Sequence, residues 1–236
     1  VNTHASANLG NLALLHGIKK LCYVSSIATL GIPEDGSSIT EDTHFNQDAA
    51  NNVYSLTKYA AEMEFWRATQ EGLDAVIVNP GVILGAGSWH TGSGAIFKLA
   101  SKGISYFTSG SIAVVDVRDV VLAMQGLMNS DLKNERYILV GATLSYKEFT
   151  KELALAFDKN PPKKEIAEWK LLLISSLDGL VSSLFGTKRK LLKANVKSLY
   201  TRSNYNAHKI EKSLSFNFTS VSQTIKRVAS HYKSEH

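Results

Sequence analysis

Leu21-Cys-Tyr-Val-Ser25-Ser26-Ile27 is an apolar, strand-like segment that ends in two serines, and Tyr54-Ser-Leu-Thr-Lys58 follows it along the chain. Tyr54 and Lys58 are four residues apart. On a helix both side chains therefore project from one face, and the ammonium group lies near the phenol. A serine, a tyrosine and a lysine in this order are the minimum set for moving a proton while a nicotinamide moves a hydride.

The three side chains have separate predicted roles. A phenol titrates near pH 10, so it acts as a base at neutral pH only where a neighbouring cation favours the phenolate. Tyr54 is therefore the candidate general acid or base and Lys58 the cation beside it. Ser26 is the hydroxyl that hydrogen-bonds the substrate carbonyl or alcohol oxygen. None of the three can store a hydride, so a cofactor must do so.

The Tyr-x-x-x-Lys pattern is weak by itself, because the chain contains a second copy, Tyr205-Asn-Ala-His-Lys209. An exposed helix start with a solvated lysine is the ordinary interpretation of such a pair. Strand-end punctuation is the ordinary interpretation of Ser25 and Ser26. Context favours the first copy, since the serines close a predicted strand and the helix that begins at Tyr54 runs into another strand.

Helices and strands alternate along the first half of the chain. We expect helices over 2–16, 54–70 and 116–128, and strands over 20–27, 74–78 and 136–140. Gly17 and Gly72 follow the first two helices, where glycine commonly ends a helix. The strand at 74–78 is almost wholly apolar, as expected when both faces of a sheet are covered. The alternation predicts an α/β fold with a parallel, doubly wound sheet, of which the sequence shows only the later strands.

Four motifs in order carry a family resemblance. They are Val1 to Ser26, Tyr54-x-x-x-Lys58, Val78-Asn79-Pro80-Gly81-Val82-Ile-Leu-Gly85 and Val115-Asp116-Val-Arg118-Asp119-Val. Together they resemble an extended short-chain dehydrogenase/reductase of the NAD-dependent epimerase/dehydratase family, nearest to its dihydroflavonol-reductase-like and 3β-hydroxysteroid-dehydrogenase-like branch. The resemblance covers most of the chain and fades after about Lys159. It implies a Rossmann-like fold and NAD or NADP as cofactor.

The resemblance also implies where the cofactor is held. It places the Asn79-Pro80-Gly81 backbone close to the nicotinamide and Lys58 on the nicotinamide ribose. The full set of implied cofactor contacts is Ser25, Tyr54, Lys58, Asn79, Pro80 and Val82.

One feature of the family is missing. No Gly-x-x-Gly-x-x-Gly turn between a strand and a helix occurs in this sequence. We therefore expect the N-terminal part of the family domain to be absent, which leaves the choice between NAD and NADP unreadable. We also expect no detectable NAD(P) binding by residues 1–236 alone. The sheet should either be incomplete, with the strand at 21–27 lacking a neighbour, or be completed by residues from another chain or from a further N-terminal segment.

We expect two parts in the chain. Residues 1–145 form the remaining part of a dinucleotide-binding domain, and residues 146–236 form a smaller, mainly helical C-terminal substrate lobe that begins at the capping box Ser145-Tyr-Lys-Glu148. Within the first part, 85–111 is a predicted substrate-side loop, and Trp89 and His90 are the large groups of its glycine-rich start. An exposed histidine without a function is the ordinary interpretation of His90.

The composition is that of a globular enzyme. Of 236 residues, 44% are hydrophobic and 20% charged, enough for one core or for a domain with a small lobe. The single cysteine, Cys22, excludes a disulfide framework, and no group of potential ligands has metal-site spacing, so we expect no metal. The net charge of +5 includes a basic cluster over 188–202. We interpret that cluster as a solvated face and expect no nucleic-acid partner.

The most apolar stretch, 169–185, contains Lys170 and Asp178, which argues against a membrane span. Its apolar residues recur every three or four positions and predict an amphipathic helix that packs on its own domain. A substrate lid or a membrane-surface contact is the alternative. The stripe is Ile166, Trp169, Leu173, Leu177, Leu180 and Leu184. We expect a cytoplasmic protein, with a homodimer possible.

The sequence thus predicts an NAD(P)-dependent oxidoreductase that interconverts a carbonyl and a secondary alcohol on a small or medium apolar substrate. A sugar-nucleotide epimerase or dehydratase ranks lower, because such a site needs ligands for a diphosphate and only Arg118 is an obvious candidate. Arg118 is equally well interpreted as an exposed first-turn helix residue. A non-catalytic nucleotide-sensing scaffold protein is the third possibility, and the joint presence of Ser26, Tyr54 and Lys58 argues against it.

Overall fold

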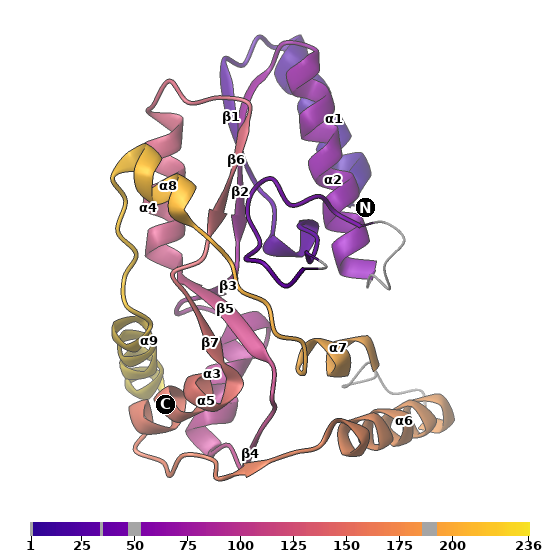
Figure 1. Ribbon diagram of the computed structural model, residues 1–236, viewed down its shortest axis with the longest axis vertical. Helices are drawn as coiled ribbons and strands as arrows, with labels where there is room; N and C mark the ends of the chain where they lie inside the picture. The colour runs from indigo at the N-terminus through magenta and orange to yellow at the C-terminus, as the bar shows by residue number, and fades with distance from the viewer. Residues whose placement is uncertain (1, 34, 47–52, 186–192) are drawn as a thin grey trace. The chain divides into compact units, whose positions relative to one another are not determined.

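The computed structural model describes residues 2–33, 35–46, 53–185 and 193–236 (Figure 1). The chain forms two compact units, each built from three separate stretches. The first unit contains 1–83, 113–142 and 204–221, and the second contains 84–112, 143–203 and 222–236.

The centre of the first unit is a parallel sheet of three strands. β1 (Lys20–Val24), β2 (Asp74–Pro80) and β6 (Glu135–Leu139) lie in the order β1-β2-β6. Cys22 is level with Val76, and Val78 is level with Tyr137. The predicted parallel α/β sheet is confirmed, and its strands include the three expected from the sequence.

Helices cover both faces of this sheet (Figure 1). α1 (Asn2–Leu15) and α2 (Val53–Gln70) pack side by side on one face, and α4 (Val117–Met128) lies on the other. Gly17 and Gly72 follow α1 and α2 with φ of 62° and 107°, conformations that a residue with a Cβ rarely adopts. The Asp116 carboxylate accepts a hydrogen bond from the Arg118 N–H at the start of α4. These local signals are why the predicted helix ends are confirmed.

The two edges of the sheet differ. Among the residues that the structure describes, β1 pairs with β2 alone and forms one edge of the sheet. On the other edge, the buried Glu41 carboxylate accepts a hydrogen bond from the Ile138 N–H at 2.9 Å. Next to it, Ile39 forms a β-bridge with Tyr205. The segment that contains α8 (His208–Leu214) therefore closes this edge.

A second three-stranded sheet was not predicted. It contains β3 (Val82–Leu84), β5 (Ser111–Asp116) and β7 (Ala142–Ser145), in the order β3-β5-β7. Two of these strands have four residues or fewer, and such short runs carry little periodicity in a sequence.

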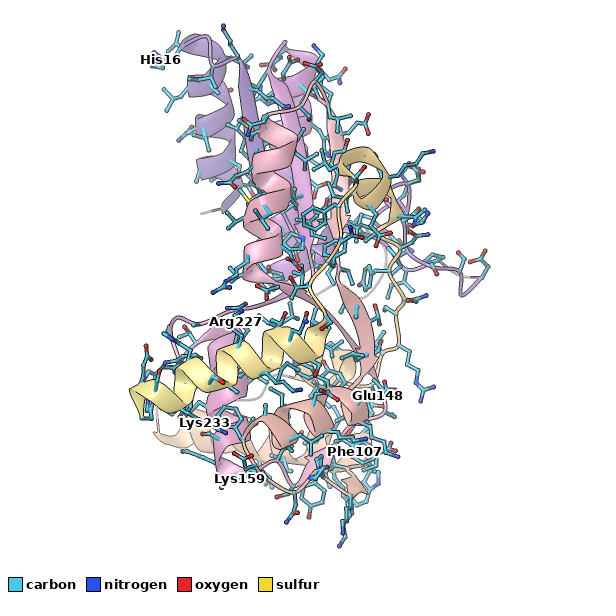
Figure 2. The ribbon with its side chains drawn as sticks, turned by 90° about the vertical axis from the view of Figure 1, so that its left-hand side faces the viewer. His16, Phe107, Glu148, Lys159, Arg227 and Lys233 are labelled. Carbon is cyan, nitrogen blue, oxygen red and sulfur yellow. The ribbon has the colours of Figure 1, made fainter. Side chains whose placement is uncertain are left out.

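The second unit is mainly helical. It contains α3 (Gly92–Lys102), α5 (Tyr146–Ala156), α6 (Glu168–Phe185), α7 (Lys193–Ser198) and α9 (Val221–Glu235), with the short pair β4 (Tyr106–Phe107) and β8 (Lys164–Glu165). The capping box of α5 is confirmed, since Ser145 and Glu148 bind each other's backbone N–H groups. Lys233 of α9 donates to Asp158, which lies two residues beyond the end of α5. Figure 2 labels Lys233 and Lys159, the residue that follows Asp158.

The predicted amphipathic helix is present as α6, but its apolar stripe is exposed. Trp169, Leu173 and Leu177 are 59%, 56% and 61% exposed. The expectation that the described part of the stripe packs on its own domain is therefore wrong. The side chains of Leu180 and Leu184 and the basic run 188–190 lie outside the described residues.

The compact units divide the chain differently from the sequence boundary at residue 145. Residues 85–111, placed with the first part on sequence, belong to the second unit, and 204–221 return to the first. Thr219 shows why this return occurs. Its backbone N–H and its hydroxyl both donate to the buried Asp119 carboxylate of α4, at 2.7 and 2.8 Å.

Candidate active site

Ser25, Ser26 and Asn79 meet where two parallel strands end. The two serines follow β1 and Asn79 lies near the end of β2, and the carboxyl ends of adjacent parallel strands share one edge of a sheet. The Ser25 N–H donates to the Val78 carbonyl at 2.8 Å, and the Asn79 amide lies 3.1 Å from the Ser26 carbonyl. Tertiary structure thus brings together residues that are more than fifty positions apart.

Ser26 is held by a short helical turn. It is the N-cap of the 3-10 helix η1 (Ile27–Thr29), and its Oγ accepts a hydrogen bond from the Ala28 N–H at 3.2 Å. The Ser26 carbonyl accepts from the Thr29 N–H and from the Thr29 hydroxyl. Since the Ala28 contact uses a lone pair of the oxygen, the Ser26 O–H retains its capacity to donate.

Lys58 reaches the same strand end from α2. Its ammonium donates to the Val24 carbonyl at 3.0 Å and to the Tyr23 hydroxyl at 3.4 Å, and it lies 5.0 Å from the centre of the Tyr23 ring. Burial raises the pKa of the Tyr23 phenol, which keeps that hydroxyl neutral and able to accept. A cation is therefore fixed beside the two serines.

Tyr54 lies in the first turn of α2, one helical turn before Lys58. Its side chain is 57% exposed. Helix geometry places the two side chains on one face, as the four-residue spacing predicted. The Tyr54 side chain is therefore open to solvent, one helical turn from the residue whose ammonium is fixed at the end of β1.

Glu62 is a member of this site that sequence reasoning missed. It is 0% exposed, and its Oε2 accepts hydrogen bonds from Ser25 Oγ at 2.5 Å and Asn79 Nδ2 at 3.0 Å. Arg136 of β6 lies 3.3 Å from its Oε1. A signal was available in the sequence, because Glu62 interrupts the buried face of α2 that includes Ala61 and Phe65.

Asn79, Pro80 and Val82 line the end of β2 and the start of β3. The Asn79 side chain is fully buried, and its Oδ1 accepts no hydrogen bond from the residues that the structure describes. Buried amide oxygens nearly always have a donor, so this acceptor suits a ligand N–H such as that of a carboxamide. The residues present are therefore compatible with a nicotinamide cofactor.

The profile of the NAD dependent epimerase/dehydratase family matches residues 1–141, which is more than half of the chain. The chain belongs to this family.

Two relatives of known description illustrate the range of the epimerase/dehydratase family. A putative dihydroflavonol 4-reductase from Synechocystis sp. is 26% identical over 232 residues, which cover 95% of this chain and 67% of that protein. A UDP-glucose 4-epimerase from Vibrio cholerae is 28% identical over 202 residues, covering 79% of this chain and 59% of that protein. The chain thus spans about two thirds or less of these relatives.

A solved structure shows the same fold. The crystal structure of PA4631, a nucleoside-diphosphate-sugar epimerase from Pseudomonas aeruginosa, superposes with a TM-score of 0.80 at 17% identity, covering 99% of this chain and 74% of that one. The family fold, a Rossmann-like sheet with a helical second part, is therefore that of this chain.

Trp89 and His90 lie in the second unit of the chain. The Trp89 indole is buried, donates to the Glu235 carboxylate at 2.5 Å and meets the Tyr232 ring edge to face at 5.0 Å. His90 is exposed, with its Nδ1 3.0 Å from the Lys98 ammonium. Trp89 thus packs against α9, and His90 faces solvent.

The two residues of the second Tyr-x-x-x-Lys copy make structural contacts at an edge of the first sheet. Tyr205 belongs to the β-bridge with Ile39, and Lys209 forms an ion pair with Glu135 at 2.9 Å while lying over the Tyr137 ring. The contacts of Lys209 anchor α8 to the edge strand β6.

Neither a metal centre nor a membrane helix occurs in the parts of the chain that the structure describes. Within those ranges, no three His, Cys, Asp or Glu side chains group closely enough to hold an ion. The same ranges contain no helix that is long and apolar enough to cross a bilayer.

Proposed function

We propose that this protein is an NAD(P)-dependent oxidoreductase that interconverts a carbonyl and a secondary alcohol on a small or medium apolar substrate. The observation that carries the proposal is the fixed position of Lys58 at the end of β1. Its ammonium binds the Val24 carbonyl directly beside Ser25 and Ser26, while Tyr54 stands one turn earlier on the same helix.

In this proposal each side chain acts on the substrate oxygen or on the proton. The Tyr54 phenol gives a proton to the oxygen during reduction and takes it back during oxidation. The Ser26 hydroxyl donates a hydrogen bond to that oxygen as its negative charge develops. The Lys58 ammonium stabilises the phenolate through its charge. A bound nicotinamide supplies the hydride chemistry, and Ser25, Lys58, Asn79, Pro80 and Val82 would hold that end of the cofactor.

The reductase assignment has support from sequence similarity. The Synechocystis relative, which matches 95% of this chain, is a putative dihydroflavonol 4-reductase.

A sugar-nucleotide epimerase is the second candidate, and the similarity to the Vibrio cholerae epimerase favours it. Arg118, the residue considered as a diphosphate ligand, is exposed in the first turn of α4. A single exposed arginine provides little for a diphosphate, which normally meets several N–H groups and cations. We therefore rank this candidate second.

The test uses the full-length protein and a panel of ketones, aldehydes and nucleotide sugars, followed by nicotinamide absorbance. Tyr54→Phe should abolish turnover and leave cofactor affinity nearly unchanged, because it removes only the proton donor. Lys58→Ala should lower both. Tyr205→Phe is the matched control and should behave like wild type.

A Tyr54→Phe enzyme with a normal rate would overturn the proposed mechanism. Epimerisation of a nucleotide sugar without net cofactor consumption would reverse the ranking of the two candidates.

A further inference from the structure

Glu62 connects the two strand ends of the candidate site. Oε2 of its buried carboxylate lies within hydrogen-bond distance of three side chains, Ser25 Oγ at 2.5 Å, Thr29 Oγ1 at 2.7 Å and Asn79 Nδ2 at 3.0 Å. These three groups come from the end of β1, from η1 and from the end of β2. One carboxylate oxygen therefore joins three separate elements.

The other oxygen of Glu62 fixes the carboxylate itself. Its Oε1 accepts from Trp66 Nε1 at 3.2 Å and from Arg136 Nη1 at 3.3 Å. Arg136 is in turn tied to the carbonyls of Glu41 and Thr43. An uncompensated buried carboxylate is strongly unfavourable, whereas one that accepts from Ser25, Asn79 and Trp66 and pairs with the Arg136 cation is held in a single orientation.

The contacts of Glu62 lead directly to the groups that define the proposed chemistry. Thr29 and Asn79, both bound to Glu62, also lie 2.9 and 3.1 Å from the Ser26 carbonyl. Ser25, the third partner, directly follows Val24, whose carbonyl accepts the Lys58 ammonium. Thr29 and Asn79 thus connect Glu62 with the backbone of Ser26, and Ser25 connects Glu62 with the Val24 carbonyl that binds Lys58.

We propose that Glu62 is a positioning residue of the active site, which sets the orientation of Ser26 and Lys58 through Ser25, Thr29 and Asn79. This inference rests on the function proposed above. Glu62 touches neither substrate nor cofactor in this role, so its loss should lower the rate of the chemical step and leave substrate binding largely intact.

Glu62→Gln is the main variant, because glutamine preserves the shape of the side chain. Its amide replaces one acceptor oxygen with an N–H₂ donor, which must face either Arg136 and Trp66 or the Asn79 amide, and both environments supply donors. Displacement of reacting groups by as little as 1 Å costs up to about 100-fold in rate. We expect kcat to fall at least about 10-fold while the KM for the carbonyl or alcohol substrate changes less than about 3-fold.

Two further variants complete the test in the full-length protein. Thr29→Val removes the hydroxyl that lies between Glu62 and Ser26 at nearly constant side-chain volume. We expect it to fold even if Glu62→Gln does not. It should lower kcat in the same direction by about 3- to 10-fold, since it removes one of the three links. Glu64→Gln is the matched control. It carries the same substitution two residues along α2, where the carboxylate pairs only with Arg67 in the part of the chain that is described, and kcat should not change.

The outcomes separate this inference from the proposed function. If Tyr54→Phe abolishes turnover but folded Glu62→Gln and Thr29→Val retain wild-type kcat, the positioning role is overturned and the function stands. A rise in the substrate KM of both Glu62 and Thr29 variants with unchanged kcat also overturns the positioning role, because substrate binding and not the orientation of the catalytic groups would then be lost. If wild type turns over no carbonyl or alcohol, or Tyr54→Phe is fully active, the proposed function falls and the role of Glu62 falls with it.

Discussion

Gly81 lies where β2 passes into β3, next to the predicted cofactor contacts Pro80 and Val82, and it has no space for a side chain. A Cβ added there would lie 2.6 Å from the carbonyl oxygen of Ala113 and 3.3 Å from Val140 Cγ2. The Gly81 N–H donates to the Leu139 carbonyl at 3.0 Å, so the end of β6 also holds the backbone at this position. Gly81→Ala therefore requires a backbone shift in at least one of these segments.

The expected destabilisation follows from the close contact with a backbone atom. Overpacking by a methyl group in a tight interior costs typically about 1–3 kcal/mol, and a carbonyl cannot rotate away as a side chain does. For a chain of this size that corresponds to a fall in Tm of about 2–4 °C per kcal/mol. The shift also displaces Pro80 and Val82, so cofactor affinity should fall with stability.

Gly87→Ala is the matched control. No atom lies within 4 Å of a Cβ at Gly87, and its φ is not in the left-handed region. Alanine reduces the freedom of the unfolded chain and should stabilise this position by up to about 1 kcal/mol. Thermal unfolding followed by circular dichroism compares the two variants. Equal Tm values for Gly81→Ala and Gly87→Ala would refute the reasoning from close packing.

Two other predictions concern residues outside the catalytic set. Asp119→Ala should destabilise the fold by about 1–3 kcal/mol in chemical denaturation, because the Thr219 N–H and hydroxyl lose a buried acceptor, whereas Asp131→Ala at an exposed position should change little. Burial raises the pKa of the Cys22 thiol to about 11. Alkylation by iodoacetamide at pH 8 should therefore be about 100-fold slower in the folded protein than in denaturant, and equal rates would contradict the burial of the thiol.

Local signals explain which parts of the fold could be predicted. Gly17, Asp116 and the Ser145–Glu148 capping box act within one turn of their helix ends, and the structure places a helix end at each. The return of 204–221 to the first unit could not be predicted in this way. It depends on the Ile39–Tyr205 bridge and the Thr219–Asp119 contact, which join residues about a hundred or more positions apart.

The exposed stripe of α6 shows the limit of periodicity. The spacing of Trp169, Leu173 and Leu177 correctly predicts a helix with one apolar face. Periodicity reports that a face is apolar and carries no information on what covers it. The prediction that this stripe packs on its own domain therefore does not follow from the spacing, and the exposures of these side chains contradict it.

Tyr54, Lys58 and Glu62 explain together why the candidate site was only partly predictable. The three residues recur every four positions along α2, so they lie on one face of the helix, and their exposure decreases from 57% at Tyr54 to 0% at Glu62. The exposed end of this series matches a known proton-transfer motif and could be recognised from its residue types. The buried end has no motif, because its meaning depends on Ser25, Asn79 and Arg136, which three different strands deliver to it. A motif identifies groups that meet the substrate, whereas the residue that orients them becomes visible only once the strands are placed side by side.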